Sequence, residues 1–479
     1  MTTEILSPPH AAARPSPTSS ARSRWAPLLV VLAGTFMMVL DFFIVNVALP
    51  SMQSHLHASS GAIEWVVAGY GLTTAVFLIT GARLGDRWGR RRVFLAGLAL
   101  FTVSSAGCGL AGSAGELVAW RLLQGVSAAM LGPNVLAIIG VIYDGADRAR
   151  ALAAYGTAMG FAAVSGQLIG GALVSVDPAG LGWRSCFLIN VPVGIAALVA
   201  GPRLIPESRA PRSGGLDVTG TVLATLGLTA VVLPLVDGRA HGWPLWTWLT
   251  LATAPLLLIA FTIQQRRLGA AGGTPLLPAG LLRSPGVATG FAAQLLFWCG
   301  QASFFLVLSL YLQQGRGLSP LHAGLVFTVL AVAYLVASMC APALTAQHGR
   351  RVLGGGALLL AGGHLVLALT VASIGVGGPV AALIPGLALV GAGMGLVIGP
   401  LATLIMAGTP AEHVGSSAGV LATLQNVGGA LGVAIVGVLF YGAASSGFAP
   451  AFELSVGALA VLLIAVATLA SRLPATIRS

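Results

Sequence analysis

The sequence predicts an all-α polytopic membrane protein with fourteen transmembrane helices, and three observations lead to this fold class. First, 56% of the 479 residues are hydrophobic and only 8% are charged, whereas a soluble domain is about 25% charged. Second, apolar stretches long enough to cross a bilayer, which takes about 20 residues, recur along the whole chain. Third, arginine is concentrated in alternate links between these stretches, as in chains that cross a membrane repeatedly.

Scanning the chain with this length gives fourteen candidate spans, each an apolar run with few charges. The first span is expected to remain as a permanent helix, because its apolar run is too long for the core of a cleaved secretory signal. The expected spans are 27–50, 61–81, 93–112, 116–139, 149–174, 184–204, 216–236, 244–263, 286–312, 321–344, 352–374, 379–405, 415–443 and 451–471.

The arginine positions predict the orientation of these spans. All 24 basic residues are arginine, because the chain contains no lysine. With the N-terminus in the cytoplasm, 20 of the 24 arginines fall on the cytoplasmic side, and the exceptions are Arg121, Arg184, Arg239 and Arg316. Since cytoplasmic loops carry the excess of basic residues, we expect a multi-pass protein of the cytoplasmic (inner) membrane with both termini in the cytoplasm.

Two short patterns recur and predict an internal duplication. The link at 83–91 matches the link at 343–351 around a shared Gly-Arg-Arg, and Gly132-Pro133 matches Gly399-Pro400 at a similar offset. Duplicated halves are typical of secondary transporters, whose substrate site lies at the midplane between them. The predicted domains are a disordered cytoplasmic tail (1–26), an N-terminal six-helix bundle (27–204), a two-helix insertion with a cytoplasmic linker (205–285), a C-terminal six-helix bundle (286–471) and a second cytoplasmic tail (472–479).

The composition excludes several classes of function. Nucleic-acid binding is not expected despite the net charge of +11, because the arginines lie scattered between long apolar runs. A nucleotide-binding loop of the G-x-x-x-x-G-K-[ST] type needs a lysine, so ATP bound to this chain is excluded as the energy source and an ion gradient remains. No metal or other cofactor is expected, since no pair of cysteines has metal-ligand spacing; we interpret all four as small core residues, namely Cys108, Cys186, Cys299 and Cys340.

Two charged residues inside the predicted spans are the leading candidates for proton coupling. Asp41 lies well inside the first span, and Arg121 lies near the start of the fourth. An ionisable side chain inside a membrane marks a functional site by default, and burial favours the neutral form of a carboxyl group that must bind and release H⁺. The helical rise from the span ends places both residues in the outer half. We expect them to share one polar cavity. The alternatives are a packing contact or a fixed ion pair for Asp41, and no contact at all between the two residues.

The link between the second and third spans is a candidate gate. Its arginines alone would fit an ordinary cytoplasmic loop. The acid within it favours a different interpretation, in which Asp86 meets helix N-termini or an arginine across the bundle and latches one conformation. The candidate gating residues are Arg83, Gly85, Asp86, Arg87, Gly89, Arg90 and Arg91.

Further polar side chains in the spans are candidates for a substrate cavity. Glu64 fits either an ordinary interfacial position or a second acid on a proton or cation path. The amides of the second half fit either substrate binding or bridging between helices, and both interpretations stay open. The candidate cavity residues are Asn46, Glu64, Gln124, Gln294, Gln301, Gln425 and Asn426.

These motifs together resemble the major facilitator superfamily, and within it the fourteen-helix drug:proton antiporters, over residues 27 to about 471. The sequence departs from the family pattern at Ala82 and Ser127, where glycine is usual, and at Gln167, where the fifth-helix antiporter motif has proline. The segments that carry the resemblance are Leu40-Asp41 to Ala48-Leu49-Pro50 in the first helix, Arg83 to Arg92 in the following loop, Arg121-Leu122-Leu123-Gln124-Gly125 in the fourth helix, Gly166-Gln167-Leu168-Ile169-Gly170-Gly171 in the fifth and Trp183 to Gly194 in the sixth.

The resemblance implies efflux of small amphipathic drugs or antibiotics in exchange for protons, by alternating access between two open states. It assigns proton coupling to Asp41 and Arg121 and the gate to Asp86 with its neighbouring arginines. The corresponding antiporter helix motif is Gly166, Gln167, Gly170 and Gly171.

Several further expectations follow for substrates and partners. No acid lies within spans nine to twelve, so neutral or weakly charged substrates are expected. The partners are then a small amphipathic substrate, protons and the lipid bilayer, with a monomer as the functional unit. The alternative within the class is a facilitator that moves a specific metabolite. A membrane-embedded transferase would need acids or histidines clustered near the headgroups, so no enzymatic activity is expected.

Overall fold

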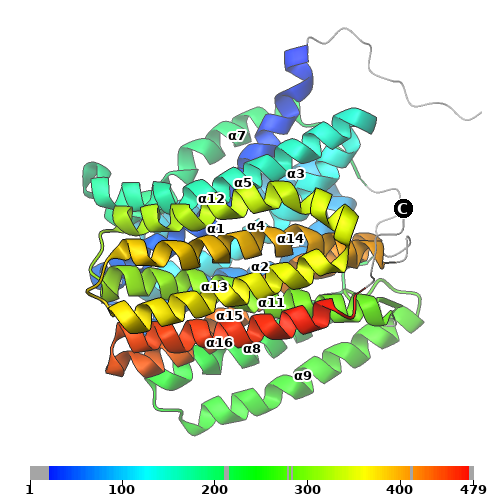
Figure 1. Cartoon of the computed structure of the whole chain (residues 1–479). Helices are drawn as coiled ribbons and strands as arrows, with labels where there is room; N and C mark the ends of the chain where they lie inside the picture. Colours follow the sequence, from blue (N-terminus) through cyan, green and yellow to red (C-terminus); the bar gives the residue numbers. More distant parts are fainter. Residues whose placement is uncertain (1–20, 210–214, 278–279, 282–283, 410–413, 474–479) are drawn as a thin grey trace, which may run out of the picture.

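The computed structural model describes residues 21–209, 215–277, 280–281, 284–409 and 414–473 (Figure 1). Within these ranges, fourteen helices are long and apolar enough to cross a membrane, which confirms the predicted spans. The α-helices are α1 (Ala21–His55), α2 (Ser60–Trp88), α3 (Arg90–Leu110), α4 (Ala114–Ile142), α5 (Gly145–Val176), α6 (Ser185–Leu188), α7 (Asn190–Leu204), α8 (Val218–Ala240), α9 (Leu245–Ala270), α11 (Pro285–Leu310), α12 (Pro320–His348), α13 (Arg350–Ile374), α14 (Ile384–Ala407), α15 (Val414–Ala443) and α16 (Phe448–Ala470). The short α6 and the following α7 together form one span, Gly182–Leu204.

Most helices extend beyond the apolar runs that predicted them. Helix α1 begins at Ala21, inside the predicted tail 1–26, while the rest of that tail and residues 474–479 lie outside the described residues. Helix α2 continues through Asp86 to Trp88, so most of the predicted gating loop is helical. The chain turns only at Gly89, whose φ of 113° is a backbone conformation that favours glycine.

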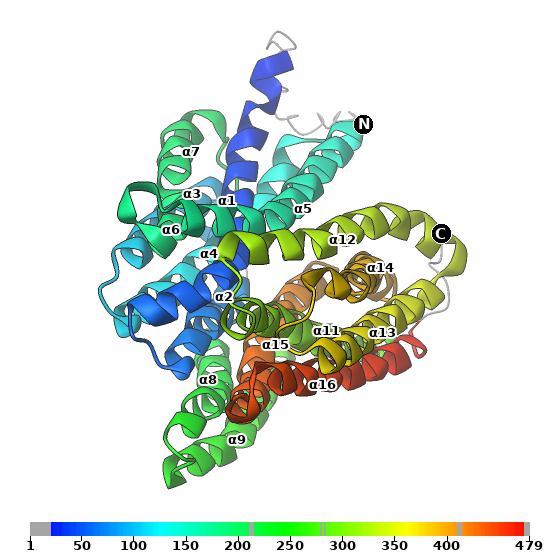
Figure 2. The same cartoon turned by 60° about the vertical axis from the view of Figure 1, so that its left-hand side comes forward.

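The two halves of the chain pack in the same way. In the first half, α4 packs on α2 and α3, and α1 packs on α5; in the second half, α14 packs on α12 and α13, and α11 packs on α15. The short links after α2 and α12 correspond as well, because each contains a glycine with positive φ, Gly89 and Gly349. The halves meet where α5 lies beside α12 and where α2 lies beside α15, as Figure 2 shows for the first of these pairs. This arrangement is the one expected from a duplication.

The two inserted helices form a peripheral pair. Helix α9 packs on α8 and lies at the edge of the molecule, whereas α8 also contacts α2 and α15 (Figure 2). Arg83 on α2 forms hydrogen bonds with the segment before α8 and with the segment after α9. Its Nη1 donates to the carbonyl of Gly215 at 3.1 Å, and its Nη2 donates to that of Pro275 at 2.8 Å. The insertion is therefore anchored to the first half of the chain at one end of the bundle.

Large apolar side chains cover the outside of the bundle. Leu110, Leu256 and Leu369 are among the exposed examples, as expected for helices that face lipid. Cys340 on α12 is also exposed, so the interpretation of all four cysteines as core residues is wrong for this one. Its apolar span gave no sign of which helix face is covered.

Candidate functional site

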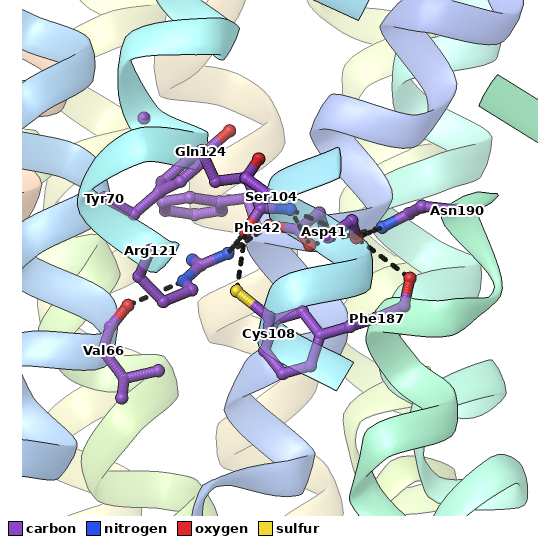
Figure 3. Close-up of polar contacts among 12 residues, drawn as sticks. Asp41, Phe42, Val66, Tyr70, Ser104, Cys108, Arg121, Gln124, Phe187 and Asn190 are labelled. Carbon is purple, nitrogen blue, oxygen red and sulfur yellow. Dashed lines mark hydrogen bonds and ion pairs between the residues drawn. The ribbon is translucent and has the colours of Figure 1, made fainter. Parts of the chain in front are cut away.

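The predicted pair Asp41 and Arg121 forms the centre of a buried polar network in the first half (Figure 3). Arg121 Nη1 on α4 lies 2.5 Å from Asp41 Oδ2 on α1. The other carboxylate oxygen, Oδ1, accepts from Gln124 Nε2 at 2.9 Å and from Asn190 Nδ2 at 3.3 Å. Two helices, α4 and α7, thus bring three donors to one carboxylate on α1. We call these four residues the buried polar network.

Arg121 also has partners for its remaining donors. Its Nε donates to the carbonyl of Val66 on α2 at 2.9 Å, and its Nη1 also contacts Gln124 Oε1 at 2.7 Å. The guanidinium carbon lies 4.3 Å from the ring centroid of Tyr70, within the range of a cation–π interaction. These contacts offset the large cost of removing two charges from water, which a buried ion pair recovers only with good geometry and additional hydrogen bonds.

The buried polar network is closed to solvent in this conformation. Asp41 and Arg121 are 0% and 1% exposed, and neither lines the large cavity between the two halves. Phe42 and Tyr70 do line that cavity, and their ring centroids lie 6.5 Å apart. The structure therefore brings Asp41 and Arg121 into contact, but the expectation that they share a polar cavity is wrong here, because these two rings lie between the network and the cavity.

A cavity of about 910 Å³, here called the central cavity, lies between the two halves. Helices α1, α2, α4 and α5 line it on one side, and α11, α12, α14 and α15 line it on the other. It extends to Asp86 and Arg90, whose side chains are 39% and 21% exposed, so it reaches solvent there. We call this the Arg-rich end of the bundle, since it carries Arg83, Arg87, Arg90, Arg91 and Arg92.

The two halves are in direct contact at the opposite end. Ser309 Oγ on α11 donates to the carbonyl of Asn46 on α1 at 2.6 Å. The backbone N–H of Leu321 on α12 donates to Ser175 Oγ on α5 at 3.0 Å. Helices α5 and α12 also touch at Gly171, where a Cβ would overlap the backbone of α12. The structure is therefore open at the Arg-rich end and closed at the other.

The predicted cavity residues separate into two groups. Gln301, Gln425 and Asn426 line the central cavity, and so does Gln167 of the fifth-helix motif. The other predicted cavity residues do not line it, and their environments differ. Asn46 Nδ2 donates within its own helix, Glu64 is buried beside Gly437 of α15, Gln124 belongs to the buried polar network, and Gln294 donates to the carbonyl of Leu421.

This division has a geometric origin. A polar residue within an apolar span is expected to avoid lipid, but the sequence does not say whether it faces the centre of the molecule or a neighbouring helix. Glu64 shows the difference, because it is 1% exposed and lies between α2 and α15. Glu64 is therefore enclosed by protein near the start of α2, and both interpretations of it stay predictions.

The predicted gating residues hold the Arg-rich end of the first half together. Asp86 Oδ1 accepts from Arg90 Nη2 at 2.9 Å and Nε at 3.1 Å, so its partner lies on the next helix rather than across the bundle. Glu207 accepts from the backbone N–H of Arg91 at 3.1 Å, and its carboxylate lies so close to Gly89 that it would have to shift if this position carried a side chain. The latch across the bundle stays a prediction, since this end is open.

Sequence reasoning missed three residues of the site. Asn190 and Tyr70 complete the surroundings of the ion pair, and Glu207 binds the gating segment. Asn190 had a detectable signal, because it is a polar residue within an apolar span. Tyr70 and Glu207 had none that separates them from an ordinary aromatic residue and an ordinary surface acid.

Two duplicated helical halves around a cavity that is closed at one end define a secondary transporter, and the fourteen apolar helices within the described residues make it a multi-pass membrane protein. The model of the Major Facilitator Superfamily matches residues 31–433, and the chain belongs to this superfamily.

Similar proteins include several transporters with assigned roles. The chain is 39% identical over 420 residues to the probable actinorhodin transporter of Streptomyces coelicolor, covering 88% of this chain and 73% of that protein. It is 35% identical over 481 residues to the cephamycin export protein of Amycolatopsis lactamdurans, covering 97% and 95%. It is 34% identical over 448 residues to the tetracenomycin C resistance and export protein of Streptomyces glaucescens, covering 92% and 80%.

Solved structures show the same fold at low identity. A crystal structure of the peptide transporter POT in complex with sulfate matches with a TM-score of 0.67 and 17% identity, covering 93% of this chain and 95% of that one. A bacterial homologue of the human lysosomal transporter Spinster, in an inward-facing and unoccupied conformation, matches with a TM-score of 0.66 and 16% identity, covering 95% and 98%. At these identities the likeness concerns the fold alone.

Proposed function

We propose that this protein exports small amphipathic drugs or antibiotics in exchange for protons. The names of its relatives describe transport, export and resistance for such compounds. The central cavity, at about 910 Å³, has room for a molecule of this size, and aromatic and aliphatic side chains line most of it. The single observation that carries the proton coupling is the buried ion pair of Asp41 and Arg121.

We propose further that the Arg-rich end faces the cytoplasm, in line with the excess of basic residues on cytoplasmic loops. The conformation with the central cavity open at this end is then inward-open, and a substrate enters past Asp86 and Arg90. The predicted domain limits and the monomer as functional unit belong to the same proposal.

The ion pair gives this inward-open state a defined protonation. Three donors around the Asp41 carboxylate favour its charged form against the opposing effect of burial, and we assign this state to the step after proton release to the cytoplasm. In the outward-open state, α1 and α4 shift relative to each other, Asp41 becomes hydrated and takes up a proton from outside, and the ion pair is lost. Asp86 then changes partner and latches the closed Arg-rich end. Because the two access states differ in protonation, the proton gradient drives the cycle in the export direction.

Charged side chains are scarce in the central cavity. Among the described lining residues, only Arg83, Asp86 and Arg90 carry charge, and all three lie at the Arg-rich end. The deeper part of the cavity therefore favours neutral substrates, because a buried charge would find no opposite charge there.

Dye transport in everted membrane vesicles tests this function. We expect an imposed proton gradient to drive uptake of Nile red, a neutral dye, more strongly than uptake of ethidium, a cation, and an uncoupler to abolish both. Asp41→Asn should remove the gradient-driven uptake while the protein still reaches the membrane. Asp144→Asn, at an exposed acid before α5, is the matched control and should transport normally. Dye uptake by the wild type that does not depend on the proton gradient would instead indicate a facilitator.

A further inference from the structure

Gln167 on α5 is a buried residue whose side-chain amide lacks hydrogen-bond partners within the ranges that the structure describes. It is 3% exposed and lines the central cavity. Neither its Nε2 nor its Oε1 has a hydrogen-bond partner within the described part of the chain. A buried amide without hydrogen bonds is destabilising, so a residue of this kind needs another reason to be there. The proline found at this position of the family motif would offer no polar side-chain atom.

Gln301 on α11 repeats this situation in the second half. It is 2% exposed, lines the same central cavity, and its Oε1 has no hydrogen-bond partner among the described residues. Its neighbour on the same helix, Gln294, differs in both respects, because it lies outside the cavity and donates to the carbonyl of Leu421 at 3.4 Å. The two halves of the transporter thus each place one residue with an unpartnered, covered amide atom at the wall of the same cavity, and these side chains reach a ligand by turning toward it.

Three phenylalanine rings accompany these amides. Phe43, Phe305 and Phe327 all line the central cavity. The centroids of Phe43 and Phe305 lie 5.3 Å apart in an edge-to-face arrangement, and those of Phe305 and Phe327 lie 5.8 Å apart in a stacked one.

The backbone contacts place the rings near the amides. Gly166, the neighbour of Gln167, packs against the side chain of Phe43, and Gly324, three residues before Phe327, packs against the carbonyl of Gln167. Phe305 lies one helical turn after Gln301. Aromatic surfaces and unsatisfied amides therefore occupy one region of the cavity.

We propose that Gln167 and Gln301 form a hydrogen-bonding subsite for an uncharged, planar aromatic compound that carries neighbouring hydroxyl and carbonyl groups. A hydroxyl group of the ligand donates to Gln301 Oε1, and its carbonyl oxygen accepts from Gln167 Nε2. The phenylalanine rings stack against or meet the edge of its aromatic face. This subsite deepens the proposed function and rests on it for its role in export, but binding itself needs no proton gradient.

Binding of two matched probes to the purified full-length protein in lipid nanodiscs tests the subsite. The probes are 1,8-dihydroxyanthraquinone and 9,10-anthraquinone, which share the planar ring system and differ in the hydroxyl groups. Quenching of tryptophan fluorescence, measured in a variant that keeps Trp298 in the wall of the central cavity and has phenylalanine at the other eight tryptophan positions, reports binding. We expect the wild type to prefer the dihydroxy probe. Gln167→Leu and Gln301→Leu should each weaken its binding by about tenfold, the effect of one lost hydrogen bond. Gln301→Leu should leave the parent probe unaffected, whereas Gln167→Leu should weaken the parent probe as well, because that probe keeps the carbonyl groups.

Gln294→Leu is the matched control, because it removes an amide of the same size from the same helix but outside the central cavity. It should leave the preference between the probes unchanged. Thermal unfolding without ligand gives an independent readout. Gln167→Leu should unfold at the same or a higher temperature than the wild type, since it replaces an unsatisfied buried amide by an apolar group.

The proposal is overturned if both leucine variants bind the two probes as the wild type does, or if Gln301→Leu loses both probes equally. It is also overturned if Gln167→Leu lowers the unfolding temperature or does not fold, because the amide would then have a structural role. A wild type that shows the probe preference but no proton-driven export would contradict the proposed function and leave the subsite in place.

Discussion

Replacing Asp41 by asparagine, Arg121 by glutamine, and both together separates the stability of the ion pair from its role in transport. Each single change leaves a buried charge without its opposite charge, and breaking a buried pair in this way costs about 3–5 kcal/mol. Asparagine at position 41 keeps an acceptor for Arg121. Asn190 can turn its unpartnered Oδ1 toward the new N–H, so we expect a value of about 3 kcal/mol for Asp41→Asn.

The double variant should recover much of this loss. It contains only neutral amides where the ion pair was, so its destabilisation should fall short of the sum of the single changes by about 2–3 kcal/mol. The free energy of unfolding, measured by denaturant titration in micelles, gives this coupling energy. Proton-driven dye uptake in vesicles should be lost in Asp41→Asn and in the double variant, because neither has a carboxyl group at position 41. Additive destabilisation, or proton-driven uptake restored in the double variant, would refute the reasoning.

Three further changes test other parts of the structure. Tyr70→Ala removes a ring that separates the buried polar network from the central cavity. Cys108, which contacts Gln124 of this network, should then react faster with a small maleimide. An unchanged reaction rate would show that other residues separate the network from the cavity. Gly171→Val should force α5 and α12 apart at the closed end, which a maleimide-reactive Ser175→Cys reports; protection as strong as in the parent protein would contradict this. Gly89→Ala places a side chain at a φ of 113°, which should cost about 1–3 kcal/mol and lower the unfolding temperature; an unaltered temperature would argue against the turn as described.

The membrane spans could be predicted because each depends on a property of a local segment. An apolar run of sufficient length has to form a helix in lipid, since only a helix satisfies its own backbone hydrogen bonds. The ends of the helices were harder to predict from the sequence. Helix α2 continues to Trp88 through a charged stretch, and the turn at Gly89 depends on a backbone conformation and a close contact with Glu207. Neither property is visible in hydropathy.

The candidate site was predicted in part, for a related reason. Asp41 and Arg121 stand out because charges are rare inside spans, and the structure brings them together. The direction in which a neutral polar side chain points depends on how its helix is rotated and packed. The sequence does not contain this information, so it predicted Gln124 as a cavity residue although Gln124 belongs to the buried polar network. Tyr70 is one aromatic residue among many in the sequence, and only its position over Arg121 distinguishes it.

For Gln167, the sequence singled out the position but did not indicate a role for its side chain. The sequence identified it only as a departure from the proline of a motif, which indicates what the helix lacks. Its unsatisfied amide in the central cavity indicates what the residue offers in return. The environment of Gln167 in the structure therefore suggests a hydrogen-bonding role that the departure from the motif alone did not reveal.

The central claim is that the carboxyl group of Asp41 binds and releases a proton, and infrared difference spectroscopy of the protein in lipid tests it directly. Acidification should produce the C=O stretching band of a protonated carboxyl group that is absent in Asp41→Asn and retained in both Glu64→Gln and Asp144→Asn. A spectrum of Asp41→Asn that keeps the whole wild-type band would contradict the account.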